Sequence, residues 1–124
     1  MAKYEFAPFP LYEISGPPFE RGLQYGQLAK KRIITSVEIY TDSLKTVGLD
    51  KDMLGGLSEQ FLPKINHWAP DLFEEMQGIA KGASLSLSEI VMINARTEIL
   101  QLAERDGSFL DQKMELFGEI CYLY

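Results

Sequence analysis

The sequence predicts a mainly α-helical protein with one short strand near each end, and three observations predict it. Apolar residues recur at helical spacing over most of residues 18–104. Strand-like runs of aromatic and branched residues are confined to residues 6–15 and 116–124. Residues that favour helix starts stand at Pro18, Pro70 and Ser86. A chain of 124 residues is long enough for a single domain, or a domain fragment, with a hydrophobic core.

The first predicted element is a strand from Phe6 to Ser15. Pro8 and Pro10 hold its backbone extended but cannot donate hydrogen bonds, so an edge position in a sheet is favoured. The run Gly16-Pro17-Pro18 ends it.

A long helix is predicted from Pro18 to Thr46. Its apolar residues form one stripe at 100° per residue, and charged and amide side chains lie opposite. The stripe consists of Phe19, Leu23, Gly26, Ile33, Val37, Tyr40 and Leu44. Gly22 and Gly26 each cost roughly 1 kcal/mol in helix propensity. We therefore expect another backbone to approach closely there.

Two further helices are predicted before residue 83. One runs from Leu54 towards Trp68, and Pro63 should bend or divide it because proline lacks the N–H that a helix interior needs. His67 is interpreted as a residue at the end of this helix. The next helix opens at Pro70, and Gly82 is predicted to stop it.

The last predicted helix spans Ser86 to Glu104. Ser86 and Glu89 have the spacing of a capping box, in which each side chain bonds to the other's backbone N–H. Its apolar residues point in almost every direction, so we expect burial on more than one side. Asn94, Arg96 and Glu98 interrupt this apolar surface, and we expect them to be buried with polar partners. A loop and a strand, Leu116 to Tyr124, follow.

Composition excludes several classes of function. The net charge is −6, which disfavours nucleic acids and anionic membranes as partners. Neither a secretory signal nor a membrane span is predicted. One cysteine and one histidine, Cys121 and His67, give neither an intrachain disulfide nor metal-ligand spacing. A cytoplasmic protein without a metal or cofactor is the expectation.

Two segments resemble a known family. Gly16 to Gly26, GPPFERGLQYG, and Glu74 to Glu98, EEMQGIAKGASLSLSEIVMINARTE, are similar in order and spacing to motifs of the acyl-CoA:6-aminopenicillanic acid acyltransferases, peptidase family C45. The second segment is the more specific. The resemblance covers roughly residues 8–100.

The resemblance implies a fold and a mechanism. Members are N-terminal-nucleophile (Ntn) hydrolases with a four-layer αββα sandwich. The resemblance therefore implies an α+β fold class, in which this chain would be the helical N-terminal portion. Their precursors cut themselves before a cysteine, whose freed α-amino group serves as general base for its thiol. The thiol then attacks a small acyl substrate, an N-acyl amide or an acyl thioester.

Carried onto this sequence, the resemblance makes Cys121 the candidate nucleophile, since Gly118-Glu119 precede it. Ile120 and Tyr122 depart from the family pattern, and a second alignment places Ser108 at that position. Most of the sandwich is absent from 124 residues, so the chain alone is expected to be inactive. Its expected partner is the remainder of the catalytic domain (the β-chain), or a second copy held through the exposed apolar helix. The alternative is a non-catalytic helical interaction module or a degenerate family remnant.

Overall fold

The computed structural model describes residues 10–106, which form seven α-helices and contain no strand. The prediction of a mainly helical chain is confirmed for these residues. The helices are α1 (Pro18–Leu28), α2 (Lys30–Thr46), α3 (Lys51–Glu59), α4 (Leu62–Trp68), α5 (Pro70–Ala83), α6 (Leu87–Asn94) and α7 (Arg96–Asp106). None of the helices in this part of the chain is long and apolar enough to cross a membrane.

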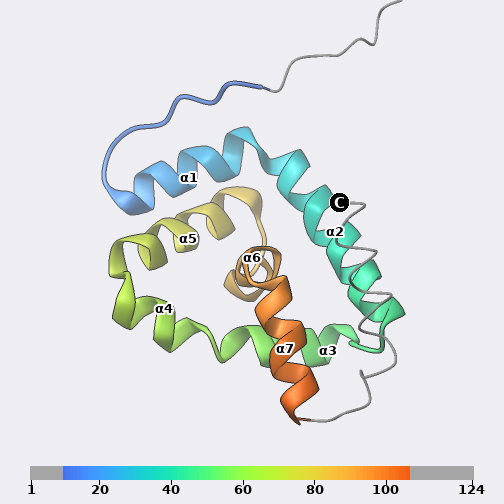
Figure 1. Cartoon of the computed structure of the whole chain (residues 1–124). Coiled ribbons are helices and arrows are strands. Elements are labelled where there is room, and N and C mark those ends of the chain that lie inside the picture. The colour runs from blue at the N-terminus through green and yellow to red at the C-terminus, as the bar shows by residue number, and fades with distance from the viewer. Residues whose placement is uncertain (1–9, 107–124) are drawn as a thin grey trace, which may run out of the picture.

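The helices form a frame around α6. In Figure 1, α1 and α2 lie along two sides and α3 and α4 along a third, while α5 rises from the end of α4 to lie against α1. The central helix α6 contacts α2, α3 and α5, and α7 leaves it to cross α3. This arrangement explains why the apolar residues of α6 follow no single stripe: neighbours surround them.

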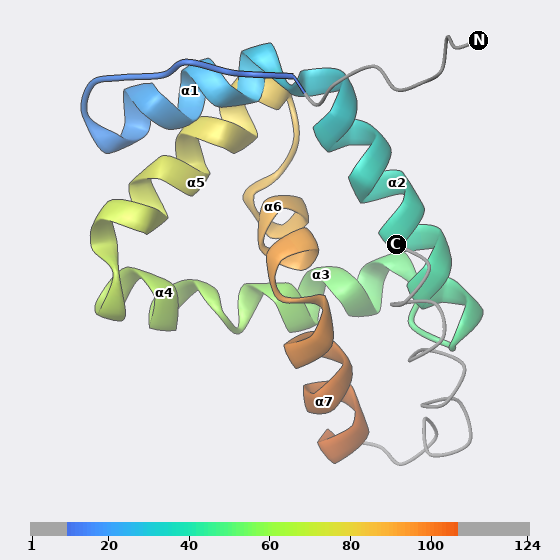
Figure 2. The same ribbon diagram turned by 45° about the horizontal axis from the view of Figure 1, so that its top comes forward.

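The N-terminal strand is not present in residues 10–15, where that prediction is wrong. These residues are extended beside α1 (Figure 2), but their hydrogen bonds go to a side chain. The Gln24 amide accepts from the Ser15 N–H at 3.1 Å and donates to the Ser15 carbonyl at 2.8 Å. Gln24 thus bonds to the Ser15 N–H and carbonyl, which a neighbouring strand would otherwise use. Residues 6–9 and the predicted strand at 116–124 lie outside the described residues.

The helix predicted from Pro18 to Thr46 is divided at Ala29. Ala29 leaves helical geometry, with φ −101° and ψ 16°, while its N–H still donates to Tyr25 and its carbonyl accepts from Ile33. The division lets α1 lie along α5 while α2 turns to contact α3 and α6. Gly48, with φ +100°, follows the end of α2.

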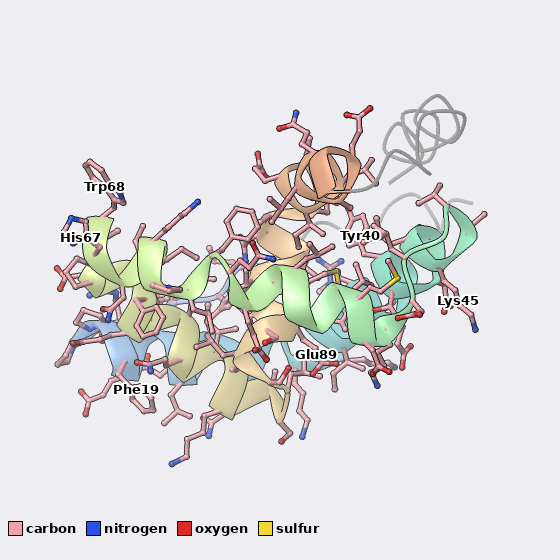
Figure 3. The ribbon with its side chains drawn as sticks, turned by 90° about the horizontal axis from the view of Figure 1, so that it is seen from below. Phe19, Tyr40, Lys45, His67, Trp68 and Glu89 are labelled. Carbon is pink, nitrogen blue, oxygen red and sulfur yellow. The ribbon has the colours of Figure 1, made fainter. Side chains whose placement is uncertain are left out.

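The prediction that Pro63 divides its helix is confirmed. α3 ends at Glu59 and α4 begins at Leu62, which places Pro63 in the first turn of α4. Asp50 caps α3, because its side chain accepts the Met53 N–H at 2.9 Å. His67 and Trp68 end α4, as predicted, with their rings edge to face at 5.6 Å (Figure 3).

Gly82 does not stop α5, contrary to the prediction. The helix continues to Ala83, and Ser84 adopts the left-handed conformation at φ 60°. The Leu85 N–H then bonds back to the Ala80 carbonyl at 2.9 Å. Gly82 lies inside the helix for another reason, its contact with α1.

Four glycines bring α1 and α5 into backbone contact. A Cβ atom at Gly22 or Gly26 would overlap a carbonyl oxygen of α5, and one at Gly78 would overlap a carbonyl oxygen of α1. A Cβ at Gly82 would lie 2.5 Å from the Leu23 carbonyl oxygen. The close approach predicted from Gly22 and Gly26 is therefore confirmed, and it is reciprocal.

The predicted helix from Ser86 to Glu104 starts as expected but is divided. Both bonds of the capping box are present, at 2.9 Å and 3.1 Å. The helical path breaks at Ala95, with φ −122° and ψ 26°. The chain buries the apolar residues of both halves itself: Ile90, Val91, Met92, Ile99 and Leu100 are at most 3% exposed. The expected burial on more than one side is confirmed for these residues, because α6 contacts α2, α3 and α5.

Candidate site at the α6–α7 junction

The motif Asn94-x-Arg96-x-Glu98 forms the junction between α6 and α7. Asn94 is the last residue of α6, and its amide nitrogen donates to the Ile90 carbonyl at 2.8 Å. Arg96 is the first residue of α7 and donates to the Ile93 carbonyl at 3.3 Å. The Arg96 side chain therefore satisfies a carbonyl in the last turn of α6, whereas Asn94 bonds back within its own helix.

Arg96 is held between two helices. Its guanidinium carbon lies 4.6 Å above the ring of Tyr40 on α2, a cation–π distance. The residue is half-buried, and its Nε is buried without a hydrogen-bond partner among the described residues. A guanidinium so placed links the start of α7 to α2. It also keeps donor capacity that a carboxylate or carbonyl would satisfy.

The expected burial of the three polar residues holds only for Arg96. Asn94, at the end of α6, and Glu98, in the first turn of α7, are exposed, whereas Arg96 between them is half-buried. The sequence pattern predicted one continuous helix here, whereas the chain turns at Ala95.

The candidate nucleophiles lie outside the described residues. Neither Cys121 nor Ser108 can be placed relative to the junction. Among residues 10–106, no group of three or more His, Cys, Asp or Glu side chains is arranged to hold a metal ion. Trp68 is 82% exposed beside His67, at the end of α4 and away from the junction.

Two hollows flank α6, and the sequence did not indicate either. One has a volume of about 320 Å³ and lies between α3 and α6, with Lys51 and Glu89 as its charged residues. Gly55 opens this hollow, since a Cβ there would meet no atom within 4 Å. Ser58 also lines it, and its hydroxyl oxygen is buried without a hydrogen-bond partner among the described residues. The second hollow, about 330 Å³, adjoins the junction through Asn94.

The sequence that encodes the packed α1–α5 pair, the capped α6 and the α6–α7 junction is similar to that of an acyltransferase. The acyl-coenzyme A:6-aminopenicillanic-acid-acyltransferase 40 kDa form of Emericella nidulans is 36% identical over 96 residues, covering 74% of this chain and 27% of that protein. Protein dcd1A of Dictyostelium discoideum is 29% identical over 118 residues, covering 75% and 25%. No family model matches the chain.

These similarities support a relationship to the acyltransferase family, in agreement with the motif at Glu74 to Glu98. The chain spans about a quarter of the length of the curated relatives it matches. The described helices therefore correspond in extent to only part of such a protein.

Proposed function

We propose that this chain is the N-terminal helical segment of a cysteine-dependent Ntn acyltransferase or amidohydrolase. The observation that carries the proposal is the 36% identity to an acyltransferase over 96 residues. The Arg96 contacts support it, because they join the start of α7 to α2 and to the end of α6. In this proposal α7 leads the chain towards a self-cleavage junction.

The proposed chemistry uses Cys121 as the nucleophile. Cleavage of the peptide bond before it frees its α-amino group, which takes the thiol proton. The sulfur then bonds to the acyl carbon of an amide or thioester, and the amine or thiol leaves with a proton. Water or an amine accepts the acyl group and releases the sulfur. The remainder of the catalytic domain supplies the oxyanion donors and the acyl pocket.

Intact-mass measurement tests self-cleavage directly. The chain is expressed together with the coding sequence that follows residue 124. We expect one product that ends at Ile120 and another that begins at Cys121. Cys121→Ala should leave the precursor whole, whereas Ser108→Ala should still be cleaved. Cleavage before Ser108 would move the nucleophile to that residue, and an uncut wild-type precursor would refute autoprocessing.

The activity is tested with an acyl thioester. The 124-residue chain should release no thiol above the rate of the blank, and the cleaved longer product should release it. Thiol release from the longer product but not from its Cys121→Ala variant is the expected pattern. Equal release from both would refute the cysteine mechanism.

One observation favours a second candidate, a non-catalytic helical interaction module. The residues of α6 and α7 that should have needed an outside partner are buried within the chain itself. A module of this kind would transfer no acyl group with or without the downstream sequence. Acyl transfer that appears only with the downstream sequence would exclude it.

A further inference from the structure

The hollow beside Asn94 is large enough to hold a small ligand. It is bounded by the extended segment 10–17, α1, α2, α5 and α6, and its volume is about 330 Å³. This value lies near the lower end of the range, roughly 300–1,000 Å³, that ligand sites in proteins occupy. Figure 2 shows the extended segment lying along α1, beside the first turns of α2.

Two tyrosines form one wall of this hollow. The rings of Tyr12 and Tyr25 lie edge to face, with centroids 5.9 Å apart and an interplanar angle of 80°. The two bonds between Gln24 and the Ser15 backbone hold the extended segment, and with it Tyr12, against α1. The wall therefore does not depend on a single ring contact, and it offers aromatic surface to a flat occupant.

Isoleucines form the floor. Ile33 and Ile90 are 6% and 1% exposed, and both belong to the core that joins α2, α5 and α6. Ile79 and Ile93 are half-buried beside them. Branching at Cβ restricts these side chains to few rotamers, so the floor keeps its shape. An apolar occupant would rest on a preformed surface.

The rim carries positive charge. Arg32 lines the hollow, is exposed, and has no ion pair or hydrogen bond within residues 10–106. Among residues 10–106, no carboxylate lines the same hollow, although the net charge of the chain is −6. Ser36, one helical turn after Arg32, and the amide of Asn94 add hydrogen-bonding groups. A carboxylate matches a guanidinium by charge and by its two acceptor oxygens.

We propose that this hollow binds a small aromatic carboxylate, with its ring between the tyrosines and the isoleucine floor and its carboxylate on Arg32. The proposal rests on the geometry of residues 12–94 and does not depend on the acyltransferase function. Its occupant need not react, because no described residue beside it is a nucleophile of that mechanism.

Calorimetric titration of the 124-residue chain with 2-naphthoate tests the proposal. The neutral analogue 2-naphthylmethanol separates the contribution of the carboxylate from that of the ring. We expect saturable binding of one equivalent of 2-naphthoate and at least tenfold weaker binding of the alcohol. Equal affinities for the two, or no saturable binding of 2-naphthoate up to its solubility limit, would overturn the proposal.

Neighbouring residues of α2 provide matched variants. Arg32→Gln and Lys31→Gln each remove one positive charge from an exposed position, but only Arg32 lines the hollow. Arg32→Gln should raise the Kd about tenfold, which corresponds to about 1.4 kcal/mol. Lys31→Gln should change it less than twofold. Equal increases in Kd for the two variants would show that Arg32 acts only through the overall charge of the protein. That result would refute the assignment of the carboxylate to Arg32.

A second pair of variants tests the location. Ser36→Phe places a ring in the hollow, whereas Thr35→Phe points the same ring away from it, since Thr35 is exposed and does not line it. Loss of binding in Ser36→Phe alone is the expected result. Binding that survives in Ser36→Phe, with the helical circular dichroism spectrum unchanged, would place the ligand elsewhere. If Ser36→Phe does not fold, the charge variants at exposed positions still decide the question.

Discussion

Gly78→Ala should destabilise the protein, although alanine is the better helix former. The new Cβ would overlap the Phe19 carbonyl oxygen and lie 2.7 Å from the Leu23 amide nitrogen. Both are backbone atoms of α1 and cannot rotate away as a side chain would. α1 and α5 must therefore separate by roughly 1 Å, which forfeits about a quarter to a half of each dispersion contact across the crossing.

The expected magnitude follows from three contributions. With on the order of 20 atom pairs at ~0.1–0.2 kcal/mol each, separation costs about 1 kcal/mol. Residual overpacking adds about 1–3 kcal/mol, and the better helix propensity of alanine returns about 1 kcal/mol. The net loss is about 2 kcal/mol in the free energy of unfolding, or a decrease in Tm of roughly 10 °C for a chain of this size.

Chemical denaturation with matched controls measures this loss. Gly55→Ala makes the same substitution in α3, where the new Cβ meets no atom within 4 Å. That variant should be more stable than wild type by about 0.5–1 kcal/mol. The double variant Gly22→Ala/Gly78→Ala should lose less than the sum of its parts, because one separation accommodates both. A Gly78→Ala protein as stable as wild type would refute the reasoning.

Three further substitutions probe local features by the same denaturation measurement. Ser86→Ala removes the cap of α6 and should lower the free energy of unfolding by about 1 kcal/mol. Ser88→Ala, inside the helix, should change it by less than about 0.5 kcal/mol. Equal losses in the two variants would argue against a stabilising cap. Ser84→Gly should raise stability by up to about 1 kcal/mol, because the left-handed conformation strains a residue with a Cβ; a loss would show that the serine side chain matters more than the strain. Arg96→Met keeps the aliphatic stem but removes the charge above Tyr40, and should cost about 0.5–1 kcal/mol; an unchanged midpoint would show that the ring contact contributes nothing.

Local chemistry made the helix starts predictable. Pro18, Pro70 and Ser86 each stand within one residue of an observed helix start, because proline geometry and serine capping act through neighbouring residues only. The divisions at Ala29 and Ala95 were not predictable in this way. Alanine has the highest helix propensity of any residue, so packing on other elements must determine where those two helices turn.

Glycine gives an ambiguous signal in a sequence. Gly82 is of the residue type that commonly ends a helix, but here its missing side chain allows α1 to approach closely. Ser84 adopts the left-handed conformation at the helix end instead. The motif that contains Asn94 and Arg96 could be recognised, yet its exposure could not, since it depends on the turn at Ala95. The hollow beside Asn94 is built from five separate segments, and no local pattern encodes such a combination.

The glycine crossing also has a consequence for the order of folding. Arg21 and Glu75, which form an ion pair between α1 and α5, are separated by 54 residues. Closing a loop of this length costs chain entropy before any contact across it is gained. Ile90 of α6 completes its core with α2 and α5 only once that loop has closed. We therefore expect closure of the frame to limit the folding rate, so that Gly78→Ala slows refolding more than it speeds unfolding.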